Sequence, residues 1–228
     1  MIEAEWWDYD SAEEMAEAVA GDVGFIIESA LDARGSALIA LPGDDSAQAI
    51  FPALAQVDLK WREVVVIPTN DLLVPVDSEE SRARAIAQAF LSKGARVIPI
   101  ATKLDDYRQS GNAADARLQD LPWPPDLVWL TVGEDGSVAG IAAGPDLQDA
   151  LEAPKARRAV GVMPESGEPQ VTLTRSSILS ARTILITVVG QQKREMVEQA
   201  IADGHSSRLP IGRVLAETEL PIDIHWRA

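Results

Sequence analysis

Glycines and acidic residues occur together in residues 131–145, TVGEDGSVAGIAAGP, directly after the apolar run DLVWLTV. A strand that runs into a glycine-rich turn is a common seat for a phosphate group or an oxyanion, because the backbone N–H groups can point at the anion. This segment contains Glu134 and Asp135 but no Lys, Arg or His. Its chemistry would therefore depend on carboxylates and on backbone groups.

Acidic residues also follow two earlier apolar runs. Asp45 lies in LPGDDS, after SALIAL, and Asp71 lies in TNDLLVP, after EVVVIP. Carboxylates that crowd in one cleft raise one another's pKa, which can prepare one of them to act as a general base. Asp45, Asp71 and Asp135 are therefore candidate catalytic residues. The alternative is that each is a solvated loop acid or a helix cap.

The elements that must position these loops alternate between short β-rich runs and helical patterns. This order predicts an α/β fold, with a mostly parallel sheet and helices on both faces. Such sheets bind ligands beyond the carboxyl ends of their strands. The expected strands are 36–41, 63–68, 95–100, 126–132, 158–163, 170–174, 182–190 and 221–226.

Helices are expected between most of these strands. The first covers 11–31, with Ser11 as N-cap and Glu14 completing a capping box. Another covers 78–91, with Ser78 as its cap and Ser81 close behind, and the segment 46–56 is a helix weakened by Pro52. Residues 192–204 form an amphipathic helix, and 107–125 a surface helix with a loop.

Composition limits the classes of partner. The formal charge is −16 over 228 residues and the pI is about 4.4, which argues against nucleic acid, because its binding depends on Lys and Arg. No cysteine is present, and no apolar run approaches the ~18 residues of a membrane span. We expect a single cytoplasmic domain (1–228) that binds a small molecule, without nucleic-acid or membrane partners, as a monomer or weak homodimer.

The four loops after the main strands, read in order, resemble those of the 6-phosphogluconolactonase family, within the sugar-phosphate isomerase and deaminase superfamily. The family's Gly-Gly-Ser-Thr-Pro turn corresponds to GDDSA (43–47), and its Asp-Glu-Arg before Val-Pro corresponds to NDL (70–72). Its Ser-Asn, followed two residues later by Arg, corresponds to SRAR (81–84). The family stretch Gly-x-Gly-x-Asp-Gly-His-x-Ala-Ser-x-Phe-Pro-Gly aligns with 131–144.

The last third of the chain resembles the family more closely. VTLTRSSILSAR (171–182), GQQKREMVEQAI (190–201) and SSRLPIGRVL (206–215) match family segments, with Lys193 and Arg208 at family positions and Gln170 where Arg is usual. The glycine-rich loop departs from the pattern: Thr131 replaces Gly, Ser137 replaces His, Gly140 replaces Ser, and Ala142 and Ala143 replace Phe-Pro.

The resemblance implies a NagB-like fold and hydrolysis of 6-phospho-D-glucono-1,5-lactone in pentose phosphate or Entner–Doudoroff sugar metabolism. It implies no metal and no cofactor. The family histidine is thought to activate water, and Ser137 cannot replace it, because a hydroxyl without a partner base is a poor proton acceptor. Native activity should be reduced or lost. The implied substrate-binding residues are Gly43, Ser46, Asn70, Arg84, Gly133, Gly136, Lys193 and Arg208.

Phosphate binding is the weaker half of this interpretation. Asp44 and Asp45 occupy the first turn, and a carboxylate ~4 Å from a phosphate repels it by about 4 kcal/mol at an effective dielectric of 20. Arg82 and Arg84 are candidate cations, unless they pair with Glu79 and Glu80 on their own helix. His205 and His225 lie near the C-terminus, where packed or solvent-facing imidazoles are expected.

Two other functions stay open. The substitutions describe a roomier, partly apolar pocket, which suits a less charged small molecule and a carboxylate general base. The chain could also be a non-catalytic pseudoenzyme that binds a sugar phosphate. A paralogue with lost or changed activity and a deliberately redesigned pocket would both give this pattern.

Overall fold

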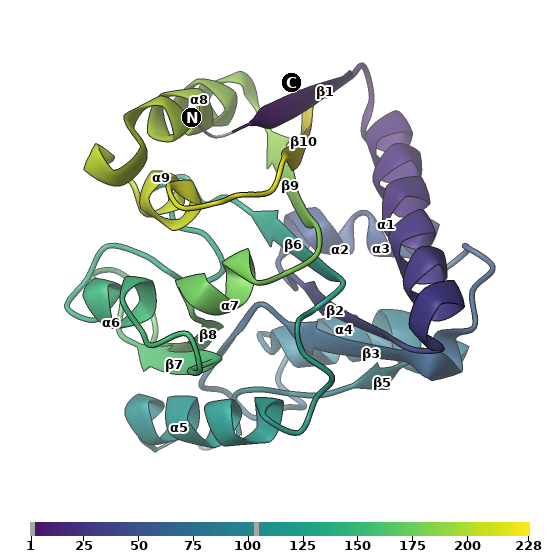
Figure 1. The fold of residues 1–228 in the computed structure, drawn as a ribbon, viewed down its shortest axis with the longest axis horizontal. Helices are drawn as coiled ribbons and strands as arrows, with labels where there is room; N and C mark the ends of the chain where they lie inside the picture. Colours follow the sequence, from purple (N-terminus) through teal and green to yellow (C-terminus); the bar gives the residue numbers. More distant parts are fainter. Residues whose placement is uncertain (1–2, 103–104) are drawn as a thin grey trace.

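A seven-stranded parallel sheet forms the centre of the computed structural model, which describes residues 3–102 and 105–228 (Figure 1). Every neighbouring pair of strands in this sheet runs parallel. In spatial order the strands are β1 (Ala4–Tyr9), β10 (Ile222–Arg227), β9 (Ile184–Val189), β6 (Leu127–Thr131), β2 (Ala37–Leu41), β3 (Val64–Pro68) and β5 (Arg96–Val97).

The continuous apolar runs of the central strands follow from burial on both faces of this sheet. Side chains alternate across a strand, so Leu38 and Ala40 of β2 enter one core while Ile39 and Leu41 enter the other. All four residues are at most 1% exposed. The predicted α/β class and mostly parallel sheet are confirmed.

Helices cover both faces. The core with Ile39 contains residues of α1 (Ala12–Arg34), α2 (Asp45–Gln48), α3 (Phe51–Leu54) and α4 (Arg82–Phe90). The core with Leu38 contains residues of α5 (Tyr107–Leu118), α6 (Leu147–Leu151), α7 (Arg175–Leu179), α8 (Gln191–Asp203) and α9 (Pro210–Leu215). Short 3-10 turns cover Trp61–Glu63, Leu91–Lys93 and Gly204–Ser206.

A second, three-stranded antiparallel sheet was not foreseen. It contains β4 (Asn70–Leu72), β8 (Gln170–Leu173) and β7 (Ala159–Val162), in that order. The sequence predicted the strands at 158–163 and 170–174 but not their third partner, because β4 has only three residues, two of them polar. Pairing of β4 with β8 brings Asn70 opposite Thr172 and Leu72 opposite Gln170.

Several element boundaries also differ from the prediction. The helix expected over 46–56 is two short helices, because Pro52 lies at the start of α3. Helix α4 begins after Ser81, whose side chain accepts a hydrogen bond from Arg84 N, so Ser78 is not its cap. At α1, Ser11 caps as expected, although Glu14 accepts from Asp10 N instead of from the N-cap amide.

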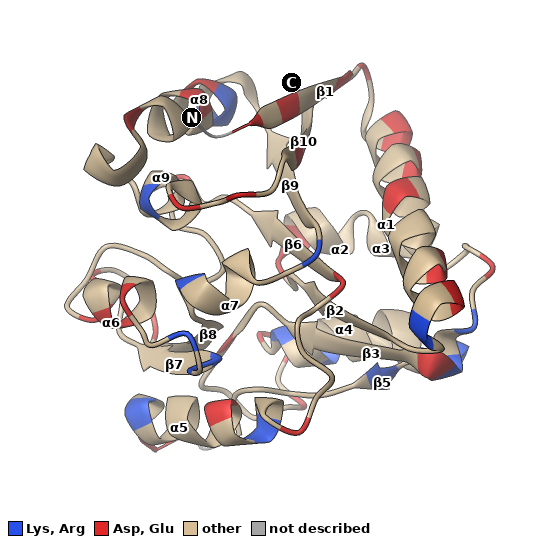
Figure 2. Ribbon diagram, in the orientation of Figure 1, with Lys and Arg blue, Asp and Glu red and all other residues tan. Residues whose placement is uncertain are grey.

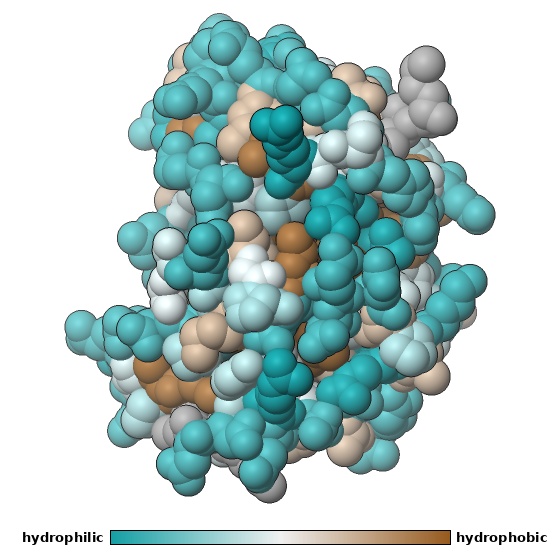
Figure 3. All heavy atoms as spheres, turned by 90° about the vertical axis from the view of Figure 1, so that its left-hand side faces the viewer, coloured by the Kyte–Doolittle hydropathy of each residue, from teal (hydrophilic) through white to brown (hydrophobic). Residues whose placement is uncertain are grey.

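The surface has acidic residues on several elements (Figure 2) and a mainly hydrophilic face (Figure 3). Acidic residues are prominent along α1 and on β1 (Figure 2). The face in Figure 3 is mainly hydrophilic, and its hydrophobic atoms form small separate groups. Within residues 3–102 and 105–228, no helix is long and apolar enough to cross a membrane.

Candidate functional site

A cavity of about 650 Å³ lies beyond the carboxyl ends of β2 and β6. All four loops that the sequence singled out contribute to it, together with the start of α4, β8 and the loop before β8. Eight of the predicted site residues line this cavity: Gly43, Asp45, Ser46, Asn70, Gly133, Asp135, Ser137 and Lys193.

Four other predicted residues do not line it. Asp71 is a buried residue of β4, and Arg208 is exposed and outside the lining. The peptide oxygen of Gly136 accepts a hydrogen bond from Ile211 N at 3.0 Å, so this glycine joins the turn to α9. Arg84 is the third residue of α4 and is not part of the lining.

Asp71 holds the start of α4. Its carboxylate accepts hydrogen bonds from Arg82 N at 2.8 Å, Ala83 N at 3.0 Å, Leu72 N at 3.0 Å and Ser81 Oγ at 3.3 Å. Burial raises the pKa of Asp71, and the bonds from the backbone N–H groups oppose this rise. A carboxylate so fully engaged outside the cavity is a structural cap rather than a base for a ligand.

The glycine-rich loop forms a tight turn around Asp135. Gly133 N donates to Ser137 O at 2.9 Å, and Ser137 N donates to Asp135 Oδ1 at 3.0 Å. Partial burial by itself would raise the pKa of Asp135, but hydrogen bonds from the Ser137 side chain and backbone lower it. The expectation that crowded carboxylates raise the pKa at this position is therefore wrong. Asp135 orders the turn and is a weak base.

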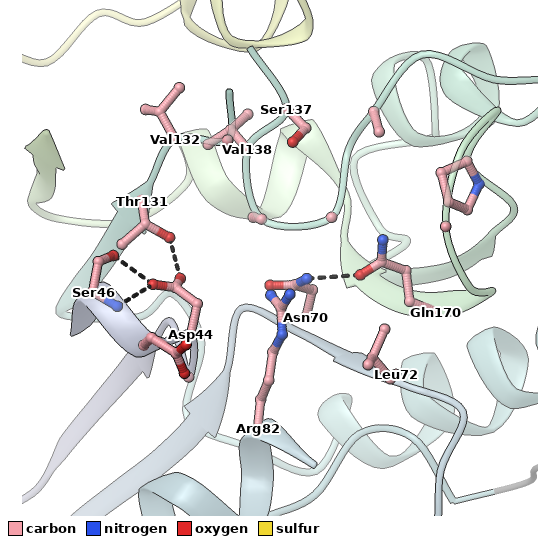
Figure 4. Close-up of a pocket in the computed structure, with 18 of the residues that line it drawn as sticks. Asp44, Ser46, Asn70, Leu72, Arg82, Thr131, Val132, Ser137, Val138 and Gln170 are labelled. Atoms are coloured by element: carbon pink, nitrogen blue, oxygen red, sulfur yellow. Dashed lines mark hydrogen bonds between the residues drawn. The ribbon is translucent and has the colours of Figure 1, made fainter. Parts of the chain in front are cut away.

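Asp44 is an important residue that the sequence reasoning treated only as a repulsive charge. It caps α2, accepting from Ser46 N at 3.1 Å and Ala47 N at 3.3 Å, and it also accepts from the Ser46 hydroxyl. Its second oxygen accepts from the Thr131 hydroxyl (Figure 4). The carboxylate therefore joins the turn after β2 to the end of β6.

Two buried amides contribute to the lining of the cavity from the small sheet. Asn70 Nδ2 donates to Gln170 Oε1 at 2.8 Å (Figure 4). Thr69 Oγ1 donates to Asn70 Oδ1 at 3.2 Å. Asn70 is 1% exposed and Gln170 is 8% exposed, so both orientations are fixed by packing. Among the described residues, Gln170 Nε2 has no acceptor, which leaves an amide donor for a ligand. The pairing of β4 with β8 creates this pair, and no sequence pattern revealed it.

The cationic side chains of the cavity differ in their surroundings. Lys193 pairs with Glu134 at 3.0 Å. Arg82 forms no ion pair or side-chain hydrogen bond within residues 3–102 and 105–228, and the expected pairs with Glu79 and Glu80 are not formed there. Burial lowers the pKa of Arg82, while the charges of Asp44 and Asp71 oppose that shift.

The lining as a whole is acidic. Seven carboxylates and two cationic side chains line the cavity, so the average field repels an anion. The acidic residues are Asp44, Asp45, Glu79, Glu80, Glu134, Asp135 and Glu168. Within the described part of the chain, no group of three or more His, Asp or Glu residues is placed to hold a metal ion.

The two histidines lie elsewhere. His205 is exposed, near the end of α8. His225 is fully buried, with Nδ1 2.8 Å from the Tyr9 hydroxyl and Nε2 3.4 Å from Asp22 Oδ2. Burial lowers the pKa of His225, although Asp22 and Asp223 oppose the shift. The prediction of a packed imidazole is confirmed for His225, and neither histidine lines the cavity.

Similar proteins were found by sequence. A 6-phosphogluconolactonase of Rhizobium meliloti (strain 1021) is 31% identical over 223 residues, covering 96% of each chain. One from Mesorhizobium japonicum is also 31% identical, over 97% of this chain and 94% of its own.

Solved structures of similar fold agree with these sequence matches. A 6-phosphogluconolactonase from Shewanella baltica superposes with a TM-score of 0.92 at 25% identity, covering 99% of this chain and 98% of its own. A monomeric glucosamine-6-phosphate deaminase of the NagB superfamily shares the fold, with a TM-score of 0.79 at 14% identity, covering 98% of this chain and 97% of its own. The family model for glucosamine-6-phosphate isomerases/6-phosphogluconolactonase matches residues 10–226. The chain belongs to this family.

Proposed function

We propose that this protein is a 6-phosphogluconolactonase-like enzyme that binds 6-phospho-D-glucono-1,5-lactone and hydrolyses it slowly. Relatives named 6-phosphogluconolactonase match nearly the whole chain, and the cavity is lined by the loops that carry the family resemblance. Its volume, about 650 Å³, is large enough for a phosphorylated sugar lactone.

The cavity supplies several groups that such a ligand needs. The Asn70 and Gln170 amides and the Ser46 and Thr131 hydroxyls can hydrogen-bond the hydroxyls of a sugar ring. The unengaged Gln170 Nε2 is a donor for the ring carbonyl, on which negative charge develops when water attacks. Asn70, Gln170 and Thr131 lie on the two sheets and Ser46 lies in α2, so regular secondary structure orients all four groups.

The observation that carries the proposal of slow hydrolysis is the state of the turn around Ser137. This hydroxyl stands where the family resemblance places a histidine, and its partner is Asp135, whose pKa is lowered by hydrogen bonds from Ser137, against the effect of partial burial. Neither group is a good proton acceptor near neutral pH. The cavity therefore has groups that can bind the ligand and polarise its carbonyl, while the base that would activate water is weak.

The test is a coupled assay for 6-phosphogluconate formed from fresh lactone, with spontaneous hydrolysis subtracted. We expect turnover at least about tenfold below that of a relative that has the histidine, since a positioned base contributes about 10²–10⁴-fold. Ser137→His should raise the rate. The matched control is Ser166→His, on the exposed part of the cavity lining, which should not. Wild-type turnover within tenfold of the relative would refute the proposed impairment.

The acidic lining favours a second candidate, a less charged small molecule handled by a carboxylate base. Leu72 and Ala142 add apolar surface beside the seven carboxylates. The pH dependence of turnover of a neutral lactone would test this. An inflection that disappears in Asp45→Asn or Asp135→Asn would support the second candidate, and one that survives both substitutions would exclude these residues as its base. Binding of 6-phosphogluconate with no turnover of any lactone would indicate the pseudoenzyme.

A further inference from the structure

Arg82 is a cation directed into the cavity without a protein partner. It is the first residue of α4, and its side chain extends from the start of that helix toward the middle of the cavity (Figure 4). The guanidinium carries five N–H donors, and none of them has an acceptor within residues 3–102 and 105–228.

The nearest carboxylates are engaged elsewhere. Asp71 accepts from Ser81 Oγ and from the backbone N–H groups that begin α4. Asp44 accepts from Thr131 and from the turn that it caps. Both charges act on the Arg82 guanidinium at a distance, but neither carboxylate accepts a hydrogen bond from it. The fold therefore keeps the guanidinium donors available.

The base of the Arg82 side chain is fixed in place. Its backbone N–H donates to Asp71 Oδ1 at 2.8 Å. Gly43 in the turn after β2 packs against it so closely that an added Cβ would lie 2.5 Å from Arg82 Cβ and 2.8 Å from its Cα. Any larger residue at 43 would displace α4 or the turn. The backbone that carries the guanidinium is thus held between β4 and the turn after β2.

A half-buried guanidinium without a hydrogen-bonded partner is unfavourable, because the charges of Asp44 and Asp71 only partly compensate its desolvation. Guanidinium groups bind phosphate through two parallel N–H···O bonds, which makes an anionic ligand a suitable partner. Lys193, the other cation of the lining, is already paired with Glu134. We propose that Arg82 is the anchor for the phosphate group of the ligand, an inference that rests on the proposed function.

This assignment changes the expected phosphate site. The family resemblance points to Arg84, Lys193 and Arg208 as cations, yet Arg84 and Arg208 do not line the cavity. It also places Leu72 where an arginine is usual, so β4 brings no charge. Arg82, at the start of the helix after β4, restores a cation to the same side of the cavity.

The experiment measures binding by calorimetry, with 6-phosphogluconate and with gluconate, which lacks the phosphate. Arg82→Met keeps the apolar stem and removes the charge, and it should weaken 6-phosphogluconate at least about tenfold, because charge-assisted bonds are lost. Gluconate should change less than twofold. Arg84→Met is the matched control on the same helix and should leave both affinities unchanged. Arg82→Lys should recover part of the loss as a point charge.

Folding is checked by thermal unfolding. Because Arg82→Met removes an unpaired charge, its Tm should equal or exceed that of the wild type. An Arg82→Met affinity for 6-phosphogluconate within twofold of the wild type would overturn the assignment, as would equal losses for both ligands. A clearly lower Tm with lost gluconate binding would overturn it in favour of a structural role.

The lactone assay separates this inference from the proposed function. If the wild type fails to hydrolyse the lactone but Arg82→Met still loses affinity for 6-phosphogluconate, the role of Arg82 in phosphate binding is supported and the proposed hydrolysis is refuted. If the wild type hydrolyses the lactone and Arg82→Met changes neither KM nor the 6-phosphogluconate affinity, the proposed hydrolysis is supported and the role of Arg82 in phosphate binding is refuted.

Discussion

Substitution of Asp44 by Asn should strengthen the binding of a phosphorylated ligand. The change keeps an acceptor for Ser46 N and Ala47 N, and the Thr131 hydroxyl can accept from the new amide group instead of donating to the carboxylate. The cap of α2 and the link to β6 are therefore preserved. What is lost is one negative charge near Arg82.

The magnitude follows from the position of the carboxylate. Two like unit charges about 6 Å apart repel by about 0.7 kcal/mol in bulk water and by about 2.8 kcal/mol at an effective dielectric of about 20. Asp44 is half-buried, so an intermediate value of about 1.4 kcal/mol applies, which corresponds to about tenfold in affinity. The gain should shrink as salt is added, because part of the interaction is screened.

The assay is calorimetric titration of 6-phosphogluconate at low and high salt. Glu28→Gln, on the exposed side of α1, changes the net charge equally and serves as the control. An equal gain in this control would mean that long-range charge, not the cavity, controls affinity. Weaker binding by Asp44→Asn would refute the reasoning, because it would show that the carboxylate positions ligand-binding groups more than it repels the anion.

Two further predictions concern stability. Gly111→Ala places a Cβ 1.9 Å from the backbone nitrogen of Gly161 and should lower the free energy of unfolding by about 3 kcal/mol, the upper range for overpacking. Gly21→Ala on α1 is the control, because its Cβ meets nothing within 4 Å, and it should raise the free energy of unfolding by up to about 1 kcal/mol. Denaturant titration checks both, and a tolerated Gly111→Ala would contradict the packing of α5 on β7. Burial lowers the folded-state pKa of His225. Its stabilising contribution is therefore present above the unfolded pKa of about 6.5 and is lost as the pH falls through the folded pKa. The free energy of unfolding changes by at most about 1.4 kcal/mol per pH unit in this range. Unfolding between about pH 7.5 and pH 5 should therefore depend less on pH in His225→Gln, and equal pH profiles would exclude His225 as the source.

Patterns of apolar residues were sufficient to predict most of the fold. The runs that became β2, β3, β6 and β9 are buried on both faces, so hydrophobicity alone marks them. The strand β4 was not predicted because two of its three residues are polar and because it pairs with β8, about a hundred residues away. Local propensity contains no record of such a distant partner.

The candidate site was predictable only to the level of its loops. Parallel topology brings the carboxyl ends of strands together, and this was sufficient to place Asp45, Asn70 and Ser137 at one cavity. Whether a side chain faces a ligand or the backbone depends on packing within a few ångströms. For that reason Asp71 was predicted as a base although it caps α4, and Arg82 was undervalued although it enters the cavity.

The decisive measurement compares the rate of 6-phosphogluconolactone hydrolysis by the wild-type protein, by Ser137→His and by a relative that has the histidine. We expect slow hydrolysis by the wild type, at least about tenfold below the relative, and a clear increase in Ser137→His. Wild-type turnover within tenfold of the relative would contradict the proposed slow hydrolysis, whether or not the histidine raises the rate.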